Sequence, residues 1–369
     1  MENARTLFLE LLTAALWNRA PRENLFQQTG TPVWEEISAL ASMQKVNALI
    51  YDGMMMLPPT LRPEKKIAYQ LHLQAEFVEK SNQRVNAILA QLSENYNSVG
   101  CPFVLLKGQG NALLYPNPRH RTPGDIDVFL YRPGDYEKAN NWAREQGFEM
   151  GAENIHHQEF EYYDTLVENH KYVSYFGIAK YDRLLNEIVR EIIAGNEFPA
   201  VTIQGVSVRV LPHTFNAFFI FQHLFHHFIH LGVGIRQLCD WVLFWNAYSG
   251  HINKEEFNQL ATRIGLLNAM QVFASVAVKY LGADPRMFPF AIDTQSEYVD
   301  MVMEDIFIGG SFGYALFQHK RFINKWHRKW YTFRCTAKRK RKIKPLAPAH
   351  VSSLLMNKIY TNMKLIVKW

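Results

Sequence analysis

The sequence has few cysteines and no long uncharged apolar run. Cys101, Cys239 and Cys335 lie far apart without paired spacing, which argues against a disulfide framework or a zinc site and favours a reducing compartment. The N-terminal stretch contains acidic residues and lacks both a basic start and a small-residue cleavage site, so we expect no signal peptide. The most apolar segment, residues 215–234, is interrupted by histidines, which is not typical of a membrane-spanning helix. These absences predict a soluble cytoplasmic protein.

Acidic residues are missing from the end of the chain. Residues 311–369 contain 15 Lys and Arg but no Asp or Glu, whereas residues 1–310 hold 25 basic and 34 acidic side chains. The positive charge therefore belongs to this tail, and residues 320–344 mix it with aromatic side chains. Such a composition suits contact with anionic lipid at the inner face of the membrane, or with nucleic acid. The plain alternative is a solvated segment that packs on the acidic body.

Hydrophobic side chains, by contrast, are plentiful. They make up 48% of the 369 residues, enough for a sizeable core. Residues 1–98 show helical periodicity, residues 99–211 alternate short apolar strands with helices, and residues 212–310 return to amphipathic helices. Residues 311–369 form the basic aromatic tail. We therefore predict an α+β fold with a central mixed sheet between an N-terminal and a C-terminal helical region.

Two aspartates interrupt the apolar strand that we predict at residues 125–131. Asp125 and Asp127 are two apart, so their side chains share one face of a strand. Aspartate is disfavoured in strands, and like charges on one face repel. A divalent cation bound between the two aspartates would offset their repulsion. Mg²⁺ typically binds one or two carboxylates together with substrate phosphate oxygens. A third carboxylate on a neighbouring strand would allow a two-metal arrangement.

A glycine turn, Lys107-Gly108-Gln109-Gly110, precedes this strand. Glycines let backbone N–H groups approach a phosphate closely, and a helix that begins there presents its positive end to an anion. Lys107, and Arg121 in the loop that follows, are candidates to balance triphosphate charge during phosphoryl transfer. Their alternative role is an ion pair with the aspartates when no ligand is bound.

These motifs resemble the nucleotidyltransferase superfamily that includes DNA polymerase beta and the small aminoglycoside nucleotidyltransferases. The sequence is more similar to an uncharacterised nucleotidyltransferase family, and the resemblance covers roughly residues 1–300. The matching motifs are Leu106-Lys107-Gly108, Tyr115-Pro116, Arg121, Gly124-Asp125-Ile126-Asp127, His223, His227, Gly232-Val233-Gly234-Ile235-Arg236 and Asp240-Trp241. Two features depart from the superfamily pattern: Gln109 stands where Ser or Gly is usual, and the 15 residues that follow it before Asp125 form a longer gap.

The resemblance implies transfer of a nucleoside monophosphate from a nucleoside triphosphate, with ATP among the candidates, to a hydroxyl or phosphate of an unknown acceptor. It implies Mg²⁺ or Mn²⁺ as the cofactor, with Asp125 and Asp127 as metal ligands. Gly108 and Gln109 would contact the nucleotide phosphates. Two other functions stay open: a catalytically inactive nucleotide- or partner-binding module, and a toxin–antitoxin-like enzyme that transfers AMP to a protein or RNA.

The third carboxylate is expected in residues 158–170. We prefer Glu168, because the family places an acidic residue two positions before a histidine there, with Glu161 and then Glu159 as alternatives. Glu168 would complete the metal site and help to deprotonate the acceptor. His170 itself is either an ordinary strand histidine or a partner of these carboxylates.

Histidines recur four apart between His223 and His230, a spacing that can hold zinc. The surrounding phenylalanines favour core packing instead, with one or two of these histidines lining the cleft opposite the metal. Arg236 and Asp240 are also four apart, which suits an ion pair on a helix surface. If they face the cleft, Arg236 is a candidate contact for a phosphate or a base.

Overall fold

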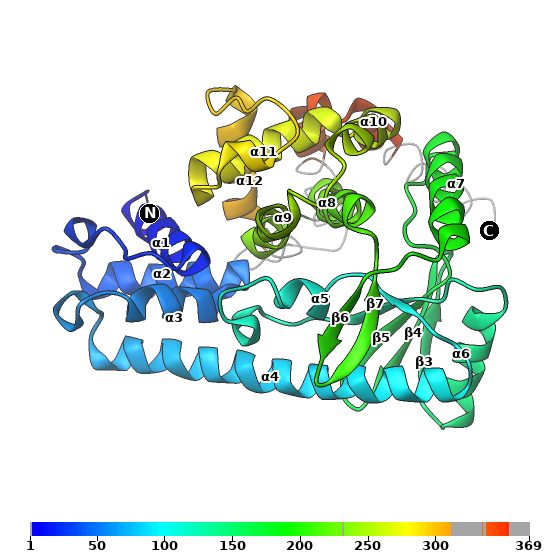
Figure 1. Cartoon of the computed structure of the whole chain (residues 1–369). Helices are drawn as coiled ribbons and strands as arrows, with labels where there is room; N and C mark the ends of the chain where they lie inside the picture. The colour runs from blue at the N-terminus through cyan, green and yellow to red at the C-terminus, as the bar shows by residue number, and fades with distance from the viewer. Residues whose placement is uncertain (1, 231, 311–333, 335–336, 354–369) are drawn as a thin grey trace.

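The computed structural model describes residues 2–230, 232–310, 334 and 337–353, and it has the α+β architecture that the sequence predicts (Figure 1). The strands are β1 (Val104–Leu105), β2 (Ile126–Phe129), β3 (Met150–Glu153), β4 (His157–Tyr162), β5 (Thr165–His170), β6 (Ala200–Ile203) and β7 (Val206–Val210). The helices are α1 (Glu2–Trp17), α2 (Thr31–Gln44), α3 (Asn47–Met55), α4 (Lys65–Ser98), α5 (Gln109–Ala112), α6 (Asp135–Glu145), α7 (Ala179–Gly195), α8 (His213–His230), α9 (Ile235–Tyr248), α10 (Lys254–Ile264), α11 (Leu267–Leu281) and α12 (Glu297–Gly309).

The seven strands form one mixed sheet in the order β3-β4-β5-β2-β1-β7-β6. β2 pairs with β5 in parallel and with β1 in the antiparallel sense, and β4 and β5 form a hairpin. Parallel neighbours in register present side chains of paired residues on the same face. The register between β2 and β5 aligns Asp127 with Glu168 and therefore sets the geometry of the candidate site.

Both faces of β2 are buried. Ile126 and Val128 belong to a core that includes residues of the second half of α4 and of α6, whereas Phe129 belongs to the larger core that includes α8 and α9. Because side chains alternate along a strand, Asp127 lies on the same face as Phe129, toward α8. A carboxylate is thus placed between the sheet and the C-terminal helices.

α4 joins the two halves of the molecule. Its 34 residues extend over about 50 Å at a rise of about 1.5 Å per residue. The first half packs on α3, and the second half lies under the sheet (Figure 1). The helix lies within residues 1–98, where the sequence predicted helical structure. α4 therefore supports the loop that leads into β2.

The N-terminal and C-terminal helical regions share one hydrophobic core. Gln44 at the end of α2 shows how they join: its Nε2 donates to the carbonyl of Ile306 at 2.9 Å, and its Oε1 accepts from the N–H of Ile235 at 2.8 Å. Both bonds are buried, so this amide fixes α2 against α9 and α12.

The described part of the basic tail also packs on the C-terminal helices. Arg339 donates to Asp305 from Nε at 2.8 Å and from Nη2 at 2.6 Å, and its guanidinium lies over the ring of Phe228. Side chains of residues 337–353 join the main hydrophobic core. Much of the 320–344 segment lies outside the described residues, so membrane or nucleic-acid contact there stays a prediction.

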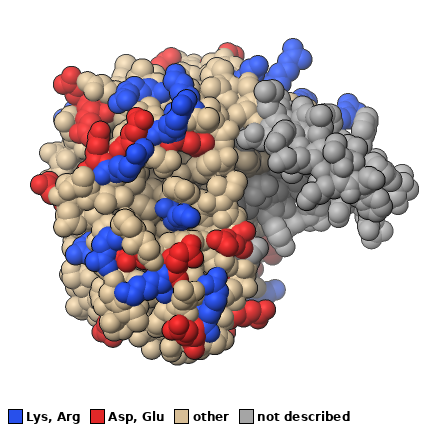
Figure 2. Space-filling model, turned by 90° about the vertical axis from the view of Figure 1, so that its right-hand side faces the viewer, with Lys and Arg blue, Asp and Glu red and all other residues tan. Residues whose placement is uncertain are grey.

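Charges of both signs are interspersed on the face of the molecule that includes α6 and α7 (Figure 2). Each of these helices carries both basic and acidic side chains. Such a mixture is typical of an ordinary solvated surface and not of a dedicated polyanion-binding face. Among the helices of the described residues, none has the length and apolar character needed to cross a bilayer.

α1 and α3 cross closely at Gly53. A β-carbon there would lie 2.2 Å from the carbonyl oxygen of Leu11. We expect Gly53→Ala to lower the free energy of unfolding by about 3 kcal/mol, because one helix must move and repack. Denaturant unfolding measures this loss. The matched control is Gly195→Ala on α7, where nothing lies within 4 Å of the added carbon. Equal losses in the two variants would contradict the close crossing.

Glu10 on α1 is a buried carboxylate that binds two arginines. Its Oε1 accepts from Nη1 of Arg19 at 2.7 Å, and its Oε2 accepts from Nε of Arg22 at 2.8 Å. Burial opposes ionisation, but these bonds prevail and lower the pKa of Glu10 from 4.5 to about 2. Because the folded-state pKa is depressed, the stabilisation is complete above about pH 4.5 and is lost as the pH falls toward 2.

Glu10→Gln tests this pH dependence. Both arginines are partly exposed, so we discount the full linkage energy and expect the variant to be less stable by about 1–2 kcal/mol at pH 7. The difference between the wild type and the variant should shrink as the pH approaches 2, as measured by denaturant unfolding at a series of pH values. A difference that stays constant with pH would show that the charge of Glu10 contributes nothing.

Candidate active site

The two aspartates of the predicted strand lie at its start. Asp125 ends the loop before β2, and Asp127 is the second residue of β2. The Asp127 side chain is almost fully buried, whereas that of Asp125 is 35% exposed. The pair therefore has an inner and an outer member, with the outer carboxylate accessible from solvent.

Glu168 on β5 is aligned with Asp127 across the parallel strand pair. Glu159 lies opposite Glu168 on β4, and Glu161 lies opposite Leu166, farther along the hairpin and exposed. Among the described residues, Glu168 and Glu159 belong to clusters of potential metal ligands, and Glu161 does not. The register thus supports the choice of Glu168 and places Glu159 ahead of Glu161 as the alternative.

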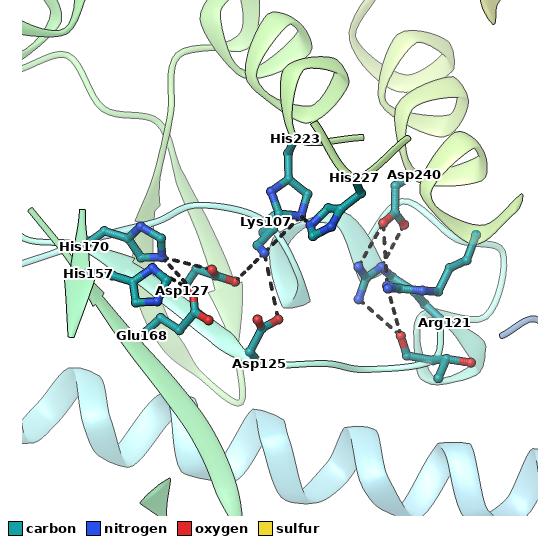
Figure 3. A network of polar contacts seen from close by, with 12 residues as sticks. Lys107, Arg121, Asp125, Asp127, His157, Glu168, His170, His223, His227 and Asp240 are labelled. Carbon is teal, nitrogen blue, oxygen red and sulfur yellow. Dashed lines mark hydrogen bonds and ion pairs between the residues drawn. The ribbon is translucent and has the colours of Figure 1, made fainter. Parts of the chain in front are cut away.

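Lys107 points at both aspartates from the turn after β1 (Figure 3). Its Nζ lies 3.1 Å from Oδ2 of Asp127 and 3.9 Å from Oδ1 of Asp125. On its other side, Nζ is 3.2 Å from Nε2 of His223, which in turn lies 3.0 Å from Nε2 of His227. Burial alone would lower the pKa of Lys107, but the nearby aspartates outweigh it and raise the pKa above its ordinary value. The lysine is therefore a fixed cation.

His223 and His227 lie on α8, and Lys107 lies between them and the carboxylates (Figure 3). Burial and the positive charge of Lys107 hold the pKa of His223 well below its ordinary value, and the same causes lower the pKa of His227 to about 4. Both rings are therefore neutral near pH 7. Of the two interpretations of this histidine cluster, the arrangement favours residues that line the site over a zinc site.

His170 bridges the carboxylates of Asp127 and Glu168. Its Nε2 lies 3.0 Å from Oδ1 of Asp127 and 3.1 Å from Oε2 of Glu168. Burial disfavours the imidazolium, yet these two bonds raise the pKa of His170 to about 9. His170 is thus a partner of the carboxylates and not an ordinary strand histidine.

The ionisation of the carboxylates follows from these cations. Burial opposes the charge on Asp127, but Lys107 and His170 hold the pKa of that carboxyl well below its usual range. For Glu168, burial and the negative charges of Asp127 and Asp125 raise the pKa, although His170 offsets part of this effect. Asp127 is therefore firmly ionised, and Glu168 is the more basic of the two. Neighbouring carboxyl groups with different pKa values suit acid–base chemistry.

The donor set fits a divalent cation. Carboxylate oxygens of Asp127 and Glu168 lie within 4.8 Å of each other, and Nε2 of His170 contacts both carboxylates. Oδ2 of Asp127 is buried, and Nζ of Lys107 lies 3.1 Å from it. Oxygen donors of this kind are the ligands that Mg²⁺ and Mn²⁺ prefer.

The glycine turn begins α5. Gly108 adopts a φ of 61°, a conformation that favours glycine, and its α-carbon faces the carbonyl oxygen of Asp125. The Gln109 side chain is buried, and its Nε2 donates to Oδ1 of Asn82 at 3.2 Å and also to Asn86, both on α4. Gln109 therefore ties the turn to α4. The predicted phosphate contacts of Gly108 and Gln109 stay predictions.

Arg121 forms a buried ion pair with Asp240 on α9. Its Nε donates to Oδ1 at 2.8 Å and its Nη2 to Oδ2 at 2.9 Å, while the hydroxyl of Tyr115 donates to Oδ1 at 2.7 Å. The prediction that Arg121 pairs with the strand aspartates is therefore wrong. Its partner is Asp240, because the loop places Arg121 next to α9. Its predicted contact with phosphate stays a prediction.

Arg236 lies next to this pair. Its Nη1 is 3.9 Å from Oδ2 of Asp240 and donates to the carbonyl of Thr122 at 3.4 Å. The Nε of Arg236 is buried and donates to no acceptor among the described residues. Arg236 and Asp240 therefore lie at the helix–loop junction and not on an exposed helix surface.

His157 is a site residue that the sequence interpretation missed. Its Nδ1 lies 3.5 Å from Oε2 of Glu168, and its ring packs on His170. Strands were predicted within residues 99–211, and the two-residue turn at Tyr163-Asp164 between β4 and β5 aligns His157 with His170. Burial and the charge of His170 lower the pKa of His157.

The fold and this cluster define the class: an α+β protein whose central sheet presents strand carboxylates, suited to a divalent cation, next to a buried lysine. The model of the uncharacterised nucleotidyltransferase family matches residues 31–282, and the chain belongs to that family, as its motifs predicted. Comparisons with curated proteins and with solved structures gave no match. Family membership supports nucleotidyl transfer in general.

Proposed function

We propose that the protein transfers a nucleoside monophosphate from a nucleoside triphosphate to a hydroxyl or phosphate of an acceptor, with release of pyrophosphate. Asp125, Asp127 and Glu168 would hold Mg²⁺ or Mn²⁺. When bound there, the cation would stabilise the negative charge that develops on the reacting phosphate. The alignment of Asp127 with Glu168 on parallel strands, two residues after Asp125, is the observation that carries this proposal.

The protein's own residues have distinct roles. An acceptor oxygen attacks the α-phosphorus, the bond from that phosphorus to the β-phosphate oxygen breaks, and the acceptor loses its proton. Glu168 is the best-placed base, since it is half-buried and more basic than Asp127. Lys107, a buried cation next to both aspartates, would hold the phosphate oxygens of the departing pyrophosphate.

The experiment that tests this function uses α-labelled nucleoside triphosphates. The wild type and the Asp125→Ala/Asp127→Ala variant are each incubated with one of the four nucleotides, Mg²⁺ or Mn²⁺, and a cell extract as the source of acceptor. Label that is transferred by the wild type alone would establish the chemistry, and the size of the product separates a small-molecule acceptor from a protein or RNA. Nucleotide binding without transfer would favour the binding module.

A further inference from the structure

A groove of about 460 Å³ borders the candidate active site on the side of α4. Its walls come from the end of α2, from α4, from the loop before β2, from the β4–β5 hairpin and from the start of α9. The lining residues that matter here are Lys45, Phe77, Arg84, Asp125, Leu166 and Arg236. A volume of this size is within the range of small-molecule sites. Asp125, the outer carboxylate of the candidate site, is thus one of the residues that line the groove.

The groove is rich in cations. Lys45, Arg84 and Arg236 line it, against the carboxylates of Asp125 and Asp164. Within the described part of the chain, the side chains of Lys45 and Arg84 form no ion pair, and Nε of Arg236 has no acceptor. Since Asp125 is assigned to the cation site, the remaining balance is positive and favours an anionic ligand.

Apolar side chains lie between these charges. Phe77 on α4 is 71% exposed and Leu166 on β5 is 41% exposed. Val78 and Val85 on α4 continue the apolar wall. An exposed aromatic ring beside an arginine can contact an aromatic or apolar face while the arginine binds a phosphate.

The position of the groove agrees with the geometry of phosphoryl transfer. The attacking oxygen and the leaving oxygen lie roughly in line on opposite sides of the phosphorus. If Lys107 holds the leaving pyrophosphate, the acceptor reaches the phosphorus from the side away from Lys107. Of the three carboxylates assigned to the cation, Asp125 is the one that lines the groove, so an acceptor bound there would lie next to the outer carboxylate of the site.

We propose that this groove binds the acceptor, and that the acceptor is a small molecule that combines a phosphate or similar anionic group with an apolar or aromatic face. The assignment of the groove to the acceptor rests on the proposed function. Phe77 and Leu166 would contact the apolar face, and Arg84 and Lys45 would bind the anionic group. These residues determine specificity and take no part in the chemical step.

Binding of a minimal probe tests the groove without any turnover. Phenyl phosphate carries both features, inorganic phosphate carries the anion alone, and phenol carries the ring alone. By ligand-observed NMR on the full chain, phenyl phosphate should bind tighter than either fragment. Phe77→Ala and Arg84→Gln should each weaken its binding about five-fold or more. Controls on the same helix are Leu73→Ala and Lys80→Gln. Neither residue lines the groove, so both variants should bind the probe like the wild type.

The transfer reaction supplies the second arm. With an active acceptor preparation, Phe77→Ala and Arg84→Gln should raise the acceptor KM about five-fold or more with little change in kcat or in nucleotide affinity. If the protein binds the probe through Phe77 and Arg84 but shows no transfer, the groove is a binding site and the proposed function is refuted. If both variants transfer label with the wild-type acceptor KM, or bind the probe like the wild type, the proposal that the groove binds the acceptor is wrong. If either variant instead raises the Kd of the nucleotide, the groove binds the nucleotide and not the acceptor.

Discussion

Asp125→Asn should lower the rate of label transfer from a nucleoside triphosphate by about 10³-fold and leave thermal stability nearly unchanged. A cation site contributes several kcal/mol to the stabilisation of the transition state, and each loss of about 1.4 kcal/mol is a factor of ten in rate. The carboxylate is 35% exposed and its nearest cation, Lys107, is 3.9 Å away, so little folding energy depends on it. Single-turnover transfer and thermal unfolding measure the two effects.

The control for this variant is Glu161→Gln, an exposed carboxylate on the β4–β5 hairpin. It should transfer label at the wild-type rate. Asp127→Asn should lose as much activity as Asp125→Asn but also lose stability, because it leaves Lys107 and His170 without a buried counter-charge. Normal transfer by Asp125→Asn would remove that residue from the site.

Asp240→Ala should lower the free energy of unfolding by about 3–5 kcal/mol. The variant leaves the buried guanidinium of Arg121 without its carboxylate and the hydroxyl of Tyr115 without its acceptor, and breaking a buried pair costs about this much. The same change releases the loop that carries Asp125. We therefore expect weaker transfer as well, measured at a temperature at which the variant is folded.

An exposed ion pair provides the comparison. Asp300 binds Lys279 on the surface, with a side chain that is 63% exposed, so Asp300→Ala should cost no more than about 1 kcal/mol. Denaturant unfolding of the two variants gives the contrast. Equal small losses would show that the Arg121–Asp240 pair does not hold the loop against α9.

Local patterns were enough to predict the elements that carry the site. Short strands were predicted within residues 99–211, and the apolar run around Asp125 and Asp127 predicted β2, although the strand begins one residue after Asp125. The turn at Lys107 was recognisable because glycine readily adopts the positive φ angles that other residues avoid. Strands β3 and β6 were not predicted: each has four residues, and both form the edges of the sheet, where the hydrophobic pattern is weak.

Partners from distant parts of the chain were harder to predict. Arg121 and Asp240 are separated by 119 residues, and periodicity shows that a residue is buried without showing what it contacts. Gln109 shows the same limit, since its buried contacts with α4 depend on how the turn packs. Glu168 was chosen through the family resemblance, and the strand register now gives it a geometric basis.

The measurement that tests the central claim most directly is Mn²⁺ binding by electron paramagnetic resonance, with a non-hydrolysable nucleoside triphosphate present. We expect the wild type to bind Mn²⁺, Asp127→Asn to lose this binding, and Glu168→Gln to weaken it about ten-fold or more. Glu161→Gln should bind like the wild type. Undiminished Mn²⁺ binding by Asp127→Asn would contradict the assignment of this sheet face as the cation site.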